Sequence, residues 1–407
     1  MEGDASRIPE TMSLGKSQES RRPLKESRGT EEGSTRVITI VFIALLIDLL
    51  GFTLILPLLP SILDHYSNNN DSFYMTLQHG VDWFSEVVQV PSERKYNSVL
   101  FGGLIGSIFS ILQFFSSPLT GATSDYFGRR PIMLLTVIGM IASYSLWAIS
   151  RSFELFIFSR ILGGISKGNV SLSTAIIADL QSPKARSKGM VSSIMSGFQS
   201  AAGLISPRAL FQFSAVSQNM ETSSKENLKI LGLVYFLYLF LFSGLEYTLS
   251  FLVHQHFQFS SLEQGKMFFF IGITMAVIQG GYTRQIEPGN EVKTVKRAIM
   301  VSALGFLFVG WSSNMILLGT GLLFYSFAAA TVVPCLSTVV SGYGLASQKG
   351  TVMGILRSLG ALARAFGPIV SATVYWLAGA EVCFTVCAFS FLLPFVLLGY
   401  IQKQRKE

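Results

Sequence analysis

Ten apolar segments set the architecture of this chain, because a helix of about 20 residues crosses the ~30 Å hydrocarbon core of a bilayer. Hydrophobic residues make up 50% of the 407 residues and charged ones only 14%. This composition excludes a soluble globular protein and predicts an all-α polytopic membrane protein. The expected membrane spans are residues 37–59, 98–119, 131–150, 153–180, 230–253, 267–283, 298–311, 315–341, 351–378 and 382–400.

Along the chain, connections that are rich in basic residues alternate with connections that are poor in them. The formal net charge of +7 therefore indicates membrane topology and not nucleic-acid binding. If the amino terminus is inside, the outer connections carry only Arg94, Lys95, Arg151 and Lys266, and the other connections carry the remaining bases. Both termini are therefore expected in the cytoplasm. The outer connection 60–97 contains Asn70-Asp71-Ser72, so Asn70 is a candidate glycosylation site.

The connection 121–130 joins the second and third segments, which such a short link makes antiparallel neighbours. Its glycines allow a tight turn, and its carboxylate and two arginines can interact with helix ends. This candidate gating motif consists of Gly121, Asp125, Gly128, Arg129 and Arg130. The pattern resembles the signature loop of major facilitator superfamily transporters. In that family a basic residue usually follows the aspartate, where this chain has Tyr126.

Two further stretches carry the same resemblance. Residues 48–60 are similar to the first helix of tetracycline and drug:proton antiporters, and Arg160-x3-Gly164-x3-Gly168 is similar to the family's fourth-helix motif, whose arginine is linked with proton coupling. Short echoes of the first half recur in the same order in the second half. The resemblance implies the major facilitator fold, with two pseudo-repeated helix bundles and a monomeric state.

The two halves are unequal, because only four apolar segments precede the central connection and six follow it. The resembled family has twelve helices, so we expect its fifth and sixth helices to be missing here. A related chain that has them should carry ~50–70 additional residues near 190–206. The expected organisation is a disordered cytosolic tail at 1–36, an incomplete N-terminal bundle at 37–189, a cytoplasmic connection at 190–229, a C-terminal bundle at 230–401 and a cytosolic tail at 402–407.

Apart from Glu154 and Asp179 at the ends of a span, six charged residues lie within the expected spans, where each costs a few kcal/mol unless it faces protein or water. The four bases outnumber the two acids, so a cavity that they line would be electropositive. The candidate substrate-binding or proton-coupling residues are Asp48, Arg160, Lys167, Glu246, Arg357 and Arg364. The bases would hold an anionic group, and either acid would take up and release a proton. In the alternative, ion pairs such as Asp48–Arg364 or Glu246–Arg160 only fix the helix packing.

These features predict a secondary active transporter of amphiphilic organic anions or drugs, coupled to protons and working by alternating access. One alternative is a cationic drug:proton antiporter, which the excess of bases opposes. Another is a transport-inactive, shortened protein that binds partners in the membrane. The sequence does not distinguish the plasma membrane from an internal one.

An enzyme is not expected, because the sequence contains no nucleophile–base set, phosphate loop or metal cluster. The three cysteines lie inside apolar segments, without CxxC or Cys/His metal spacing. We therefore expect no cofactor and no metal. The expected partners are a small organic substrate, protons and the lipid bilayer.

Overall fold

The structure, a computed structural model, divides the chain into the units Met1–Ile47 and Asp48–Glu407, and only the second is described below. The residues that the structure describes are 37, 39, 40, 43, 44, 47, 48, 50, 51, 53–87, 97–169, 172, 173, 206–214, 222–287, 289–343 and 349–401. The predicted tails at 1–36 and 402–407 and the junction at 190–205 lie outside these residues.

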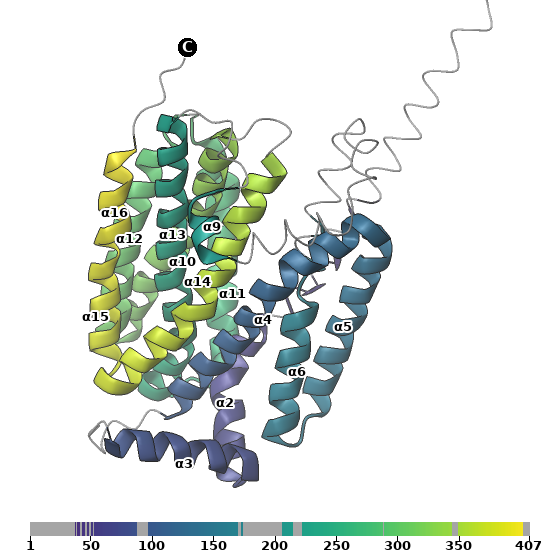
Figure 1. Cartoon of the computed structure of the whole chain (residues 1–407). Coiled ribbons are helices and arrows are strands. Elements are labelled where there is room, and N and C mark those ends of the chain that lie inside the picture. The colour runs from purple at the N-terminus through teal and green to yellow at the C-terminus, as the bar shows by residue number, and fades with distance from the viewer. Residues whose placement is uncertain are drawn as a thin grey trace, which may run out of the picture. The chain divides into compact units, whose positions relative to one another are not determined.

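All regular secondary structure in the described residues is helical, as predicted (Figure 1). The helices are α2 (Ile55–Asn68), α3 (Ser72–Val87), α4 (Asn97–Phe127), α5 (Arg129–Ile149), α6 (Phe153–Ser166), α9 (Pro207–Phe211), α10 (Thr222–Phe257), α11 (Ser261–Gly281), η4 (Thr283–Gln285), α12 (Glu291–Gly310), α13 (Met315–Tyr343), α14 (Lys349–Ala378), α15 (Ala380–Ser390), α16 (Leu392–Leu397) and η5 (Leu398–Tyr400). In Figure 1, α4, α5 and α6 run beside one another, and α10 to α16 form a second group.

Seven helical segments of the described part are long and apolar enough to cross a bilayer. They are Ser98–Ser117, Arg129–Ile149, Thr222–Phe257, Ser261–Gln285, Met315–Tyr343, Val352–Ala378 and Ala380–Tyr400. Three predicted spans are not among them. The first and fourth are described only in part, and α12 begins with a charged turn that includes Lys293. The number of ten spans therefore stays a prediction.

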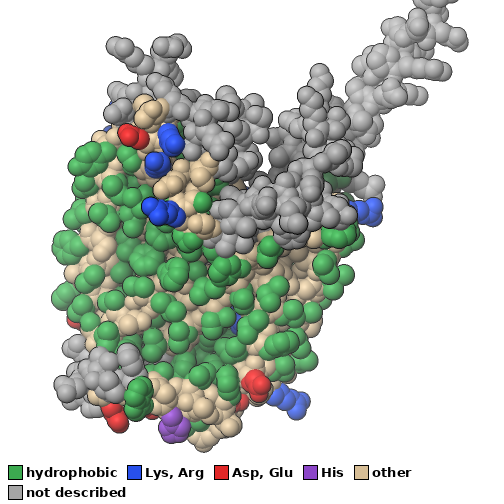
Figure 2. All heavy atoms as spheres, viewed as in Figure 1, with side chains coloured by type: hydrophobic (Ala, Val, Ile, Leu, Met, Phe, Trp, Pro, Cys, Tyr) green, Lys and Arg blue, Asp and Glu red, His purple; other side chains and the backbone are tan. Residues whose placement is uncertain are grey.

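Hydrophobic side chains cover the middle of the face drawn in Figure 2, and the charged side chains gather at its two ends. Large apolar residues on the outside of the helices, such as Phe269, Val277 and Ile316, are strongly exposed. An exposed apolar belt between two charged ends is the surface that a bilayer requires of a protein that spans it.

The predicted outer connection 60–97 is largely helical in its described residues, 60–87 and 97. Helix α2 continues through Pro60 to Asn68, and α3 follows after a short turn. Asp71 explains the turn, because one carboxylate oxygen accepts a hydrogen bond from the Tyr74 amide at 3.0 Å while the other accepts from the Phe153 amide at 3.0 Å. A single side chain thus caps α3 and ties it to the start of α6.

The predicted turn between the second and third spans is tighter than expected. Helix α4 runs to Phe127, so Gly121 and Asp125 lie in its last turns and not in a loop. Only Gly128 separates α4 from α5, with a φ of 93° that favours glycine. Arg129 begins α5 and donates a hydrogen bond to the Ser124 hydroxyl at 2.5 Å, while Arg130 is exposed.

Helix α14 contacts both groups of helices at glycines. A Cβ at Gly103 of α4 would collide with Ala372 and lie 2.7 Å from the Pro368 carbonyl oxygen. On α10, a Cβ at Gly244 would collide with Ser371. These close approaches bring the backbones of α4, α10 and α14 together, in the manner of small-residue helix contacts in membranes.

The predicted central connection is partly folded. Helix α9 and the turn after it lie within 190–229, and Leu210 and Phe213 are fully buried there. A Cβ at Gly232 of α10 would lie 2.5 Å from the Phe213 ring. The segment 206–214 is therefore docked on the C-terminal helices and is not a free linker.

Candidate functional site

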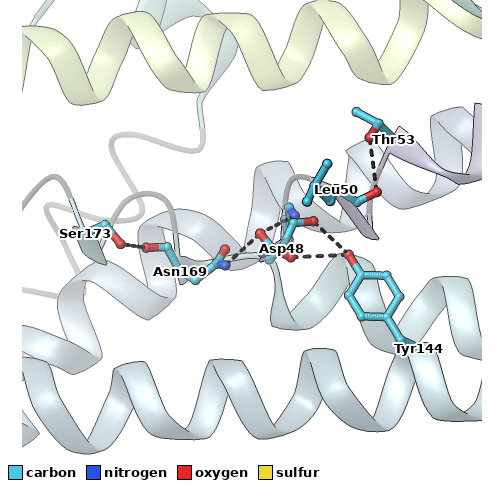
Figure 3. Close-up of polar contacts among 7 residues, drawn as sticks. Asp48, Leu50, Thr53, Tyr144, Asn169 and Ser173 are labelled. Atoms are coloured by element: carbon cyan, nitrogen blue, oxygen red, sulfur yellow. Dashed lines mark hydrogen bonds and ion pairs between the residues drawn. The ribbon is translucent and has the colours of Figure 1, made fainter. Parts of the chain in front are cut away.

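Asp48 is the centre of a buried polar network (Figure 3). The Lys167 ammonium contacts its Oδ2 at 2.5 Å, and the Asn169 amide donates to the same oxygen at 2.8 Å. The Tyr144 hydroxyl lies 3.2 Å from Oδ1 and 3.3 Å from the Asp48 backbone carbonyl oxygen. Only 7% of the Lys167 side chain and 11% of the Asp48 side chain are exposed. Four polar groups thus satisfy one another within an apolar surrounding.

A break in the fourth predicted span aims two of these side chains at Asp48. Helix α6 ends at Ser166, with Lys167 and Gly168 in a turn, and helical structure is found again at Asn169. A Cβ at Gly168 would lie 2.5 Å from Thr120, so the turn passes close to α4. The expectation of one continuous span from 153 to 180 is therefore corrected at this turn. Broken helices are typical of the substrate and ion sites of transporters.

Arg160 lies on α6 and is 3% exposed. Its guanidinium carbon is 4.5 Å from the centre of the Phe109 ring, and its Nε has no hydrogen-bond partner among the residues that the structure describes. Arg160 is close enough to interact electrostatically with Tyr144 and Lys167. A buried guanidinium with an unused donor is a strong attractor for an anionic group.

Glu246, Arg357 and Arg364 lie together in the second half of the chain. All three are half-buried, and Glu246 stands between the buried residues Leu245 and Tyr247 on α10. Arg364 on α14 is close enough to interact electrostatically with Glu246. Arg357 and Arg364 both act on Tyr235, as expected for residues two helical turns apart on one face.

Tyr247 connects the two groups of charges. It is 8% exposed and lies within electrostatic range of Arg160 from the first half and of Glu246 and Arg364 from the second. A Cβ at Gly106 of α4 would lie 2.5 Å from its ring, so Tyr247 packs directly against the first half. Charged residues from both halves therefore converge on this one aromatic side chain.

The structure does not form the ion pairs weighed in the alternative interpretation. Asp48 is paired with Lys167 and not with Arg364. Within the part of the chain described, neither Glu246 nor Arg160 makes an ion pair shorter than 4 Å. Lys167 is thus paired with Asp48, and among the described residues Arg364 is the arginine within electrostatic range of Glu246.

Sequence reasoning overlooked Tyr144, Asn169, Tyr235 and Tyr247. Asn169 carried a usable signal, because an amide inside a membrane span needs a polar partner. The tyrosines carried no such signal, because tyrosine occurs in membrane helices both in structural and in functional positions.

Asn70 is exposed in the turn before α3 and has a φ of 52°, so glycosylation there stays a prediction. Across the described ranges, no group of three or more His, Cys, Asp or Glu side chains could hold a metal ion.

Comparisons with known proteins identify the family of the chain. The sequence profile of the Major Facilitator Superfamily matches residues 41–216 and 217–368. The mouse "Major facilitator superfamily domain-containing protein 10" is 53% identical over 435 aligned positions, which cover 93% of this chain and 95% of the relative. The tetracycline resistance protein of class B from Escherichia coli is 24% identical over 381 positions, covering 83% of this chain and 88% of that protein.

One solved structure is similar in both sequence and fold. The crystal structure of the human organic anion transporter MFSD10 (TETRAN) matches with a TM-score of 0.74 and 55% identity, covering 90% of this chain and 99% of that one.

The alignment with the mouse relative is longer than the whole of this 407-residue chain, so that relative has residues without a counterpart here.

Proposed function

This chain belongs to the major facilitator superfamily, and from that premise we propose that it is a secondary active transporter of amphiphilic organic anions, coupled to protons. The family makes it a multi-pass membrane transporter and not an enzyme. The observation that carries the substrate class is the imbalance of charge around Tyr247. Two arginines, Arg160 and Arg364, lie within electrostatic range of Tyr247, against one carboxylate there, that of Glu246. The Asp48 carboxylate is already paired with Lys167. Arg357 lies within electrostatic range of the neighbouring Tyr235.

An anionic group would complete this arrangement. A carboxylate or sulfonate can accept two parallel hydrogen bonds from a guanidinium, and the unused Nε of Arg160 offers one such donor. The aromatic rings of Tyr235, Tyr247 and Phe109 would contact the apolar part of the same molecule. The name of the human relative, an organic anion transporter at 55% identity, supports this class.

The Asp48–Lys167 pair and Glu246 are the proposed proton sites. A proton that neutralises Asp48 releases Lys167, whose freed charge would rearrange the turn at Gly168 and favour the other inward or outward state. Proton uptake at one face and release at the other would then couple to rocking of the two helix bundles. The proposed topology keeps both termini in the cytoplasm, because the base-rich connections lie on that side.

We also propose that the chain lacks the family's fifth and sixth helices, so that residues 37–189 form an incomplete bundle, with a monomer as the working unit. The extra residues of the mouse relative support this proposal. Alignment of those residues between positions 190 and 206 is the expected result. Their placement anywhere else would contradict it.

Uptake by the purified chain in liposomes tests the function. We expect a radiolabelled amphiphilic carboxylate to accumulate faster than in protein-free liposomes, and an imposed pH gradient to change that rate. An amphiphilic organic cation of the same size should not accumulate. Uptake of the cation in place of the anion would favour a cationic drug antiporter, and no uptake of either would favour a transport-inactive protein.

A further inference from the structure

Two polar contacts join the first and second halves of the chain at the end of the helices where α3 lies. The His254 Nε2 of α10 is 2.8 Å from the Asp64 Oδ2 of α2, and the Ser61 hydroxyl of α2 is 2.8 Å from the Ser261 hydroxyl of α11. Neither contact involves the charged residues around Asp48 or Tyr247. Both close this end, since α2 belongs to the first half and α10 and α11 to the second.

Both ring nitrogens of His254 face hydrogen-bond acceptors. Its Nδ1 lies 3.1 Å from the carbonyl oxygen of Phe259, and its Nε2 faces the Asp64 carboxylate. A neutral imidazole has one N–H and can donate to only one of them, whereas the imidazolium donates to both. The observed arrangement is therefore fully hydrogen-bonded only when a proton is added to this His–Asp pair.

The loop after α10 holds the Phe259 carbonyl in place. Gln258 has a φ of 55°, and the Phe259 amide donates to the Val253 carbonyl oxygen at 3.2 Å. The Gln264 side-chain amide donates to the Phe259 carbonyl oxygen at 3.3 Å. The acceptor for Nδ1 is therefore built into the loop. The last turn of a helix also favours a positive charge, and His254 lies in the last turn of α10.

Few other charges act on this pair from the elements packed around it. From α3, Tyr74 lies within electrostatic range of Asp64. From α11, Glu263 is bonded to Ser260 in a capping box and is exposed. From α14, the Tyr375 hydroxyl donates to the Gln255 side chain at 3.0 Å. Asp64 is thus the one carboxylate in the described part of the chain that contacts His254.

We propose that His254 and Asp64 form a proton-dependent latch that closes the end of the transporter where α3 lies. The protonated latch holds α2 against α10, and loss of the proton leaves one ring nitrogen facing an acceptor without a hydrogen. The pair is accessible from solution, with 27% of the His254 side chain and 48% of the Asp64 side chain exposed. Acidification of the solution at this end of the transporter therefore favours the state in which this end is closed, whatever the substrate is.

The distance between α2 and α11 measures the latch directly. Spin labels at Asn68 and Leu262, both exposed and outside the latch, should show a short distance when this end is closed. We raise the pH from roughly 5.5 to 8, the range in which histidine side chains change their charge. Over this rise we expect the ratio of short to long distances to fall about two- to fivefold, a factor that corresponds to the stabilisation by a partly exposed ion pair. No substrate is needed, so a failure here is distinguishable from a failure of transport.

Three variants assign the effect to this pair. His254→Gln and Asp64→Asn should each abolish the pH response and keep the high-pH distance ratio at both pH values. His256→Gln is the matched control, because His256 is exposed on the same helix end, and it should respond like the parent chain. A parent chain without a pH response, or a His254→Gln variant that keeps it, would overturn the proposal. A response lost in His254→Gln but kept in Asp64→Asn would overturn the assigned partner.

Discussion

Replacement of Arg364 by alanine is expected to slow uptake of an organic anion by roughly ten- to hundredfold. The substitution removes one charge-assisted hydrogen bond to the anionic group, which contributes about 1.5–3 kcal/mol. It also leaves Glu246, which lies within electrostatic range of Tyr247, without the arginine that acts on it. Both effects lower the affinity for an anion. Initial uptake rates in liposomes, with the amount of inserted protein measured in parallel, give the result.

Two further variants distinguish a loss of substrate binding from a general loss of protein folding or stability. Arg364→Lys keeps the charge but loses the two-point fork, so an intermediate rate is expected. Arg297→Ala removes an exposed arginine from the charged first turns of α12 and should leave uptake unchanged. Anion uptake by Arg364→Ala at the parent rate would show that this arginine does not hold the substrate.

The second large effect concerns stability. Asp48→Asn nearly preserves the shape of the side chain but leaves the buried Lys167 ammonium without its counter-charge. Breaking a buried ion pair by removing one partner costs about 3–5 kcal/mol, and the low exposure of both side chains places this pair in that class. We expect a markedly lower Tm of the purified protein in detergent.

Removing both charges of the pair should lower the stability of the protein less than removing one of them. In Asp48→Asn combined with Lys167→Met, neither position of the pair is left with an unpaired charge, so most of the lost stability should return. Glu381→Gln, at an exposed position in the first turn of α15, is the control and should leave Tm unchanged. A single Asp48→Asn variant as stable as the parent would contradict the assigned role of the pair.

Much of the fold could be predicted from local features of the sequence. Apolar runs of bilayer length predict helices without reference to tertiary packing, and Gly128 marked the turn between α4 and α5. Helix ends were less predictable. Proline usually disfavours the interior of a helix, yet α2 continues through Pro60, and no pattern indicated the break of α6 at Lys167.

The site was predicted as a set of charges and not as a set of contacts. Asp48 and Lys167 were identified because ionisable groups in a membrane span are costly, but their partnership was not. Residues 119 positions apart meet only when the rotation of two helices is known, and packing at glycines such as Gly51 and Gly168 sets that rotation. The same reason concealed the contact between His254 and Asp64.

Binding of two ligands that differ only in charge tests the central claim most directly. An amphiphilic carboxylate and its uncharged primary amide have almost the same shape and the same apolar surface. If the arginines around Tyr247 hold an anionic group, the purified chain should bind the carboxylate at least about tenfold more tightly than the amide, since a hydrogen bond to a charged group is worth about 1.5–3 kcal/mol. Equal affinity for the two ligands would mean that these arginines do not recognise negative charge.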